Sequence, residues 1–178
     1  MFTLVIGGAA SGKSEYAEAL ALTSSYRPRY YIATMEPFGE EGRARVAKHR
    51  RMRADKQFET IERYTALSSL HLPQRGVVLL ECMGNLAANE LYSPSGAGNA
   101  ADAFAAIMDG VEMLLSQCGD LVMVSNEVFS GGNRYAEGTG DYLRLLARVN
   151  RALAWRADRV CEVVCGLPQY VKEAAEWW

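Results

Sequence analysis

Four residues near the start of the chain have the types and the spacing of a phosphate-binding loop. Gly7, Gly12, Lys13 and Ser14 satisfy the pattern G-x-x-x-x-G-K-[ST]. In this pattern the glycines let backbone N–H groups wrap a phosphate chain, the lysine reaches the terminal phosphates and the serine hydroxyl binds Mg²⁺. The sequence therefore predicts a nucleoside triphosphate as ligand. The expected nucleotide contacts are Gly7, Gly8, Ala9, Ala10, Ser11, Gly12, Lys13 and Ser14.

Two glutamates that follow apolar runs are candidates for the acidic group of such a site. Glu81 ends the run VVLLE, and Glu127 follows Asn126 at the end of LVMVSNE. P-loop enzymes place a carboxylate near the magnesium ion, normally at the carboxyl end of a neighbouring buried strand. We therefore expect Glu81 and Ser14 to bind the metal, with Glu127 as a second candidate. The alternative is that either carboxylate caps an adjacent helix or loop.

A basic segment, GRARVAKHRRMRADKQ at 42–57, contains a histidine between two arginines. On a helix, residues four apart share a face, so Arg45, His49 and Arg53 form one stripe. An imidazole can attack an α-phosphorus and form a phosphoramidate that passes its nucleotide to another phosphate. The arginines would neutralise the triphosphate and favour the unprotonated imidazole. Composition alone favours a solvated basic face instead. His71, in SSLHLPQRG, has no such neighbours and is predicted to lie in a surface loop.

These groups need a framework of alternating strands and helices. Apolar, β-branched runs predict strands at 2–8, 29–34, 75–82, 119–128 and 157–166. Helical spacing predicts helices at 14–25, 42–57, 100–118 and 141–157, whereas FETIE at 58–62 is too short to classify. Continuously apolar strands are typical of a parallel sheet that is covered on both faces. The sequence thus predicts an α/β fold, a mostly parallel sheet with helices on both faces.

Length and composition narrow the class of protein further. The chain has 178 residues, 49% of them hydrophobic, which suits one domain over residues 1–178. A net charge of −2 gives no global attraction for nucleic acid or anionic membranes. There is no apolar run of membrane-spanning length and no secretory leader, so we expect a cytoplasmic protein. Three of the four cysteines lie in or beside apolar runs, which favours reduced core thiols over a disulfide framework; the four are Cys82, Cys118, Cys161 and Cys165.

Several stretches taken together resemble one enzyme family. They are LVIGGAASGKSEYAE, YYIAT, RVAKHRRMR followed by FETIE, LLECMGNLAANE and VSNEV. The sequence resembles the bifunctional adenosylcobinamide kinase/adenosylcobinamide-phosphate guanylyltransferases of cobalamin biosynthesis, over nearly the whole chain. The resemblance implies a RecA-like P-loop fold and two reactions. A nucleoside triphosphate phosphorylates the aminopropanol hydroxyl of adenosylcobinamide, and GTP then gives its GMP to that phosphate and releases pyrophosphate.

The resemblance also implies roles for individual residues. His49 matches the family's guanylylated histidine and is, with Lys13, an expected catalytic residue. Arg45 and Arg53 match the flanking arginines and are expected on the phosphates of GTP. The expected partners are GTP, ATP, adenosylcobinamide and its phosphate, in a homotrimer that binds no nucleic acid and does not insert into membranes.

Two glutamates match acidic positions of the family. Glu81 is expected on magnesium or nucleotide, and Glu62 on the guanine or ribose. Both carboxylates can accept hydrogen bonds from guanine N1–H and N2–H₂, so the residue that recognises the base is either Glu62 or Glu81. The chain departs from many family members after SNEV, where it reads FSGGNRYAEGT, and at Ala54, where the family has proline. The first departure leaves the substrate contacts of that loop open.

Three other functions stay open on the sequence alone. A plain P-loop kinase for a small metabolite predicts γ-phosphoryl transfer without a covalent nucleotide. A nucleotide-dependent switch predicts tight binding with negligible turnover. Binding of single-stranded nucleic acid through Arg50 and Arg51 predicts a steep dependence on salt.

Overall fold

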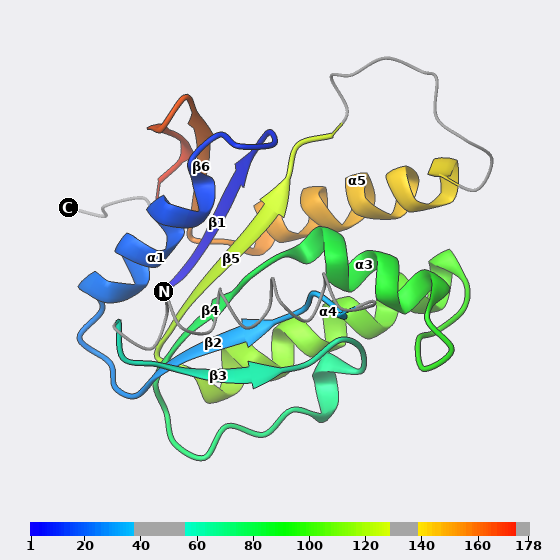
Figure 1. Cartoon of the computed structure of the whole chain (residues 1–178), viewed down its shortest axis with the longest axis horizontal. Helices are drawn as coiled ribbons and strands as arrows, with labels where there is room; N and C mark the ends of the chain where they lie inside the picture. The colour runs from blue at the N-terminus through cyan, green and yellow to red at the C-terminus, as the bar shows by residue number, and fades with distance from the viewer. Residues whose placement is uncertain (38–55, 129–138, 174–178) are drawn as a thin grey trace.

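The computed structural model describes residues 1–37, 56–128 and 139–173, and within them the strands form one seven-stranded sheet. The strand order is β3-β2-β4-β5-β1-β6-β7, and all neighbours run parallel except β6 and β7 (Figure 1). The strands are β1 Phe2–Gly7, β2 Arg29–Ala33, β3 Phe58–Glu62, β4 Val77–Leu80, β5 Asp120–Asn126, β6 Arg159–Val164 and β7 Leu167–Lys172. The helices are α1 Lys13–Thr23, η1 Leu67–Ser69, α3 Met83–Tyr92, α4 Ala100–Gln117 and α5 Thr139–Arg156.

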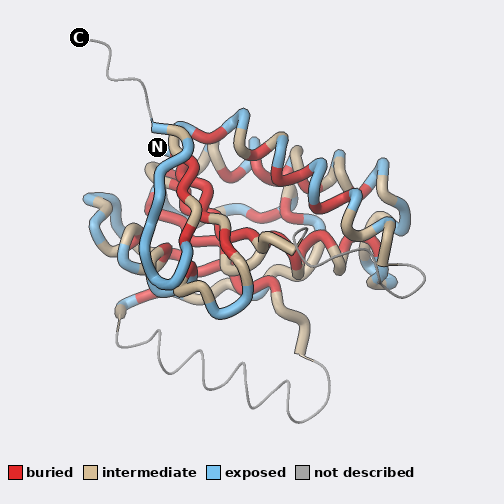
Figure 2. Tube along the Cα trace, turned by 90° about the horizontal axis from the view of Figure 1, so that it is seen from above, coloured by how far each residue is buried: buried red, intermediate tan, exposed pale blue. Residues whose placement is uncertain are grey.

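The helices cover both faces of the sheet, as predicted. Helix α1 packs on one face, where its Ala17 and Ala21 share a core cluster with Val5 of β1. Helices α3, α4 and α5 pack on the opposite face, in a larger cluster that includes Leu4 of β1 and Ile107 of α4. Consecutive residues of β1 thus point to opposite faces, as the pleat of a strand requires. Figure 2 shows that the buried residues are concentrated in the strands and on the inward sides of the helices.

The predicted strands and the helices at 14–25, 100–118 and 141–157 are confirmed, and the structure adds three elements besides the short helix η1. FETIE forms β3, which pairs in parallel with β2. Helix α3 begins immediately after β4, and β7 folds back on β6 as an antiparallel hairpin. The helix predicted at 42–57 falls almost entirely outside the described residues. Within the described residues, no helix combines the length and the apolar character that a membrane crossing requires.

The cysteines are reduced, as predicted, and two of them are buried in the core. All four cysteines are free, and Cys118 and Cys161 are buried. Cys165, however, is exposed, because β6 ends at Val164 and the chain turns there with a φ of 51° at Cys165. It belongs to the turn that leads into β7 and not to the core.

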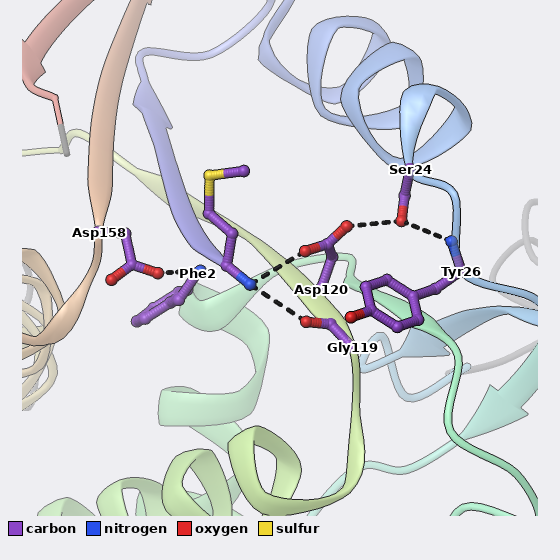
Figure 3. Close-up of polar contacts among 7 residues, drawn as sticks. Phe2, Ser24, Tyr26, Gly119, Asp120 and Asp158 are labelled. Atoms are coloured by element: carbon purple, nitrogen blue, oxygen red, sulfur yellow. Dashed lines mark hydrogen bonds and ion pairs between the residues drawn. The ribbon is translucent and has the colours of Figure 1, made fainter. Parts of the chain in front are cut away.

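The amino ends of β1 and β5 are joined by polar contacts centred on Asp120. Its carboxylate accepts hydrogen bonds from the Met1 ammonium at 3.0 Å and from Ser24 Oγ at 2.6 Å (Figure 3). Close by, the Phe2 N–H donates to Asp158 Oδ2 at 2.6 Å. Burial acts to raise the pKa of Asp120, but the hydrogen bonds and the ammonium charge outweigh it, so the pKa is lower than normal.

The lowered pKa of Asp120 predicts a pH-dependent contribution to stability. Because the folded-state pKa lies below the unfolded one, the stabilisation is complete above the ordinary value and is lost as pH falls through the lowered value. We expect Asp120→Asn to reduce the free energy of unfolding by about 1 kcal/mol at pH 7. The difference between variant and wild type should shrink in urea titrations repeated at progressively lower pH. An unchanged difference down to pH 3 would contradict this role of the carboxylate.

Candidate functional site

The residues from Gly7 to Ser14 form a loop that is shaped for phosphate. β1 ends at Gly7 and α1 begins at Lys13, so the loop joins a strand to a helix, as the sequence predicts. A Cβ atom at Gly7 would lie 2.5 Å from Ser11 Oγ and 2.7 Å from the carbonyl oxygen of Val163, so only glycine fits. Gly12 precedes α1 with a φ of 88° and provides no side-chain cap. The N–H groups of the first helical turn are therefore available to an anion.

Lys13 lies across this loop. Its side chain is buried, with 9% of the residue exposed, and Nζ donates a hydrogen bond of 2.9 Å to the carbonyl oxygen of Gly8. This contact holds the ammonium at the loop, where it adds positive charge to that of the helix N-terminus. Ser14, one residue further on, is exposed on the first turn of α1.

The hairpin of β6 and β7 supports the phosphate-binding loop from the side. The N–H of Gly166, in the turn between the two strands, donates to the carbonyl oxygen of Ser11 at 2.8 Å. Tyr16 of α1 and Tyr170 of β7 share a hydrogen bond of 2.7 Å between their hydroxyls. Burial and this hydrogen bond raise the pKa of Tyr16. Sequence reasoning missed this support because β7 itself was not predicted.

The strand order lines up the acidic candidates along the carboxyl edge of the sheet. Glu127 is nearest to the loop, because it follows β5, the neighbour of β1, and its N–H donates to Gly7 O at 3.0 Å. Glu81 follows β4, two strands from β1, or ~10 Å at the usual strand spacing. Glu62 ends β3, four strands from β1, or ~19 Å, and is exposed.

The surroundings of Glu81 distinguish it from an ordinary capping residue. Its N–H donates to the carbonyl oxygen of Ile32 at 3.0 Å, and its side chain is half-buried. Helix α3 is capped by the next residue, Cys82, whose Sγ accepts from the Asn85 N–H. Burial raises the pKa of the Cys82 thiol, while the charges of Glu81 and Lys13 act on it in opposite directions.

Three of the predicted site residues, Arg45, His49 and Arg53, lie outside the described residues. The segment that contains them joins β2 to β3, and the described chain reaches it at Pro37, just beyond the carboxyl end of β2. His71 lies between η1 and β4 and is exposed, which confirms the prediction of a surface loop residue.

Solved structures with a similar fold define the class of protein. An ATPase domain superposes with a TM-score of 0.53 at 11% identity, covering 90% of this chain and 68% of that one. A DnaB-like replicative helicase superposes with a TM-score of 0.51, also at 11% identity, covering 90% of this chain and 46% of that one. At this identity the likeness concerns the fold alone. Fold and loop together define a P-loop fold of the RecA-like type.

The family follows from the sequence comparisons. The model of the family described as cobinamide kinase / cobinamide phosphate guanyltransferase matches residues 3–171. The bifunctional adenosylcobalamin biosynthesis protein CobU of Escherichia coli K12 is 33% identical, covering 97% of this chain and 100% of the relative. CobP of Pseudomonas aeruginosa, which carries the same description, is 30% identical, covering 97% and 98%. The chain belongs to this family of bifunctional kinases and guanylyltransferases.

Proposed function

We propose that this protein phosphorylates the aminopropanol hydroxyl of adenosylcobinamide with ATP or GTP and then transfers GMP from GTP to the new phosphate. The product of the second step is adenosyl-GDP-cobinamide, and the leaving group is pyrophosphate. The observation that carries the proposal is the preformed loop from Gly7 to Ser14 in a chain that matches the kinase and guanylyltransferase family from residue 3 to 171.

The same loop serves both reactions in turn. Backbone N–H groups from Gly8 to Ser14 and the ammonium of Lys13 bind the phosphates of the nucleotide. In the first reaction the cobinamide hydroxyl attacks the γ-phosphorus, and Glu81 or Glu127 accepts its proton. The bond from the γ-phosphorus to the β-phosphate oxygen breaks, and the nucleoside diphosphate leaves. Positioning supplies most of the acceleration because an alcohol needs little further activation in a P-loop site.

The second reaction passes through His49. Its imidazole nitrogen attacks the α-phosphorus of GTP, the bond to the β-phosphate oxygen breaks, and pyrophosphate leaves. A phosphate oxygen of cobinamide phosphate then attacks the phosphorus of the histidine-bound GMP and restores the free imidazole. Arg45 and Arg53 stabilise the charge on the phosphates in both half-reactions.

Ser14 and Glu81 fit a magnesium ion. Both offer oxygen donors, which a hard divalent cation prefers, and the carboxylate of Glu81 has no hydrogen-bond partner in the part of the chain that the structure describes. A magnesium ion bound there would neutralise charge on the phosphates and polarise them.

Glu62 or Glu81 recognises the guanine. The position of Glu62, at the far end of the carboxyl edge of the sheet, suits contacts with the base or ribose.

Replacing Glu81 with glutamine tests its role as a magnesium ligand. We expect Glu81→Gln to raise the Mg²⁺ concentration needed for half-maximal GTP binding and to reduce both activities by about 10- to 100-fold. Titration calorimetry with GTP at several Mg²⁺ concentrations measures the first effect. Glu112→Gln, which changes an exposed carboxylate of α4, serves as the control. Equal magnesium dependence in Glu81→Gln and wild type would assign the metal to Glu127 instead.

Covalent labelling tests the proposed function as a whole. The purified protein is incubated with Mg²⁺ and GTP labelled at the α-phosphate, denatured, and treated with acid or alkali. A phosphoramidate is acid-labile and alkali-stable, so this pattern of label supports the histidine-bound GMP. Absence of label in a folded protein that binds GTP would favour a plain P-loop kinase.

The proposal also covers the subunit number, the location and the partners of the enzyme. We expect a homotrimer in the cytoplasm that acts on GTP, ATP and the two cobinamide substrates, without nucleic acid as a partner. Light scattering of the purified protein measures the subunit number.

A further inference from the structure

Two side chains from neighbouring strands fasten the residue that follows Glu81. Thr34, directly after β2, donates from Oγ1 to the carbonyl oxygen of Cys82 at 2.8 Å. Asn126, at the end of β5, donates from Nδ2 to Cys82 Sγ at 3.6 Å. Because β4 lies between β2 and β5, Cys82 is held from both sides, at its carbonyl oxygen and at its sulfur.

These contacts belong to a larger network of hydrogen bonds at the carboxyl edge of the sheet. On one side, Asn150 of α5 accepts from Ser125 Oγ at 2.5 Å and donates to the carbonyl oxygen of Asn126 at 3.2 Å. On the other side, Asn89 of α3 donates to the carbonyl oxygens of Thr34 and Tyr64 at 2.8 and 3.0 Å. The network therefore connects the ends of β5, β4 and β2 and the residues after β3.

Burial of three members of this network makes its geometry specific. Thr34 and Ser125 are fully buried, and Asn150 is 8% exposed. A buried polar group without a partner is costly, so these three residues favour the one arrangement in which all of them are satisfied. The last turn of α3 adds a similar contact, because the buried carboxylate of Glu90 accepts from the N–H groups of Ala66 and Ala97.

We propose that Thr34 is a positioning residue for Glu81. The Glu81 carboxylate has no hydrogen-bond partner among the described residues, so its place is set by the backbone at residues 81 and 82. Thr34 fixes that backbone through the Cys82 carbonyl, and Ile32 fixes it through the Glu81 N–H. The inference rests on the proposed function in one respect, namely that Glu81 contacts the nucleotide or its magnesium ion.

Thr34→Val tests the proposal because it keeps the shape of the side chain and removes the donor. We expect Thr34→Val to weaken binding of GTP with Mg²⁺ about fivefold, the usual effect of one neutral hydrogen bond, and Thr34→Ser to restore most of it. Thr3→Val is the matched control, since Thr3 is a buried threonine near the amino edge of the sheet. Circular dichroism and thermal melting establish that each variant is folded.

A double-mutant cycle with Glu81→Gln separates positioning from general destabilisation. If Thr34 acts through Glu81, Thr34→Val in the Glu81→Gln background leaves GTP affinity unchanged. Independent, multiplicative losses would overturn the proposal, and so would wild-type affinity in folded Thr34→Val. If Thr34→Val does not fold, Thr34→Ala, which also lacks the donor, takes its place in the cycle.

The cycle also distinguishes failure of this inference from failure of the proposed function. If Glu81→Gln alone binds GTP and Mg²⁺ like the wild type, Glu81 is not a ligand, and the positioning role falls with it. If Glu81→Gln binds GTP weakly but the wild-type protein acquires no covalent GMP, the histidine route fails. The positioning of Glu81 by Thr34 stands in that case.

Discussion

His49→Asn is expected to abolish GMP transfer while phosphorylation of cobinamide continues. The amide cannot act as a nucleophile towards the α-phosphorus, so neither the covalent label nor adenosyl-GDP-cobinamide should form. Loss of a nucleophile lowers the rate by at least about 10³-fold. The phosphate-binding loop remains intact in this variant, because its contacts from Gly8, Ser11 and Lys13 lie elsewhere in the chain. The two rates are measured separately, with cobinamide for the first reaction and cobinamide phosphate for the second.

His71→Asn is the matched control for this experiment. The chain has two histidines, and His71 is exposed between η1 and β4. The control should keep both activities and the label. Loss of both activities in folded His49→Asn would contradict the separation of roles, and a label that persists in His49→Asn would assign the nucleophile to another residue.

Lys13→Ala is expected to reduce both reactions together. In the proposed mechanism each reaction places its triphosphate in the same loop, and Lys13 is the ammonium buried against that loop. Removal of one charged donor that stabilises the transition state costs about 10²- to 10³-fold in rate. Nucleotide affinity should also fall for both ATP and GTP, which equilibrium binding measures.

Lys56→Ala provides the comparison for Lys13→Ala. Lys56 is a partly exposed lysine that pairs with Glu18 on the surface of α1, so its removal should leave both rates within about twofold. A kinase rate that is unaffected in Lys13→Ala would argue that the two reactions do not share one phosphate site.

The sequence was sufficient for the central part of the fold. Buried strands such as β4 and β5 are continuous apolar runs, and the loop at Gly7 to Ser14 has a pattern with one structural context. Helix α3 was missed because it begins directly after β4 and its cap is Cys82, which is not a usual capping residue. Strand β7 was missed because most of its residues are exposed and one is Pro168, which is tolerated at a sheet edge.

Residues of the candidate site could be predicted only where the sequence around each one has a recognisable pattern. Glu81 and Glu127 could be named from the ends of apolar runs. The partners of Glu81 could not, because Thr34 and Asn126 meet Cys82 only when β4 lies between β2 and β5. That strand order is a property of the folded chain and has no local pattern.

The support of the phosphate-binding loop by the β6–β7 hairpin has a consequence for synthesis of the protein on the ribosome. The paired tyrosines, Tyr16 and Tyr170, are 154 residues apart, and the turn at Gly166 reaches back to Ser11. A nascent chain therefore carries the loop sequence long before β7 is synthesised, and it lacks the contacts that brace the loop until β7 emerges. Such distant contacts form late in folding. Nucleotide binding by a nascent chain should thus begin only after β7 has been synthesised.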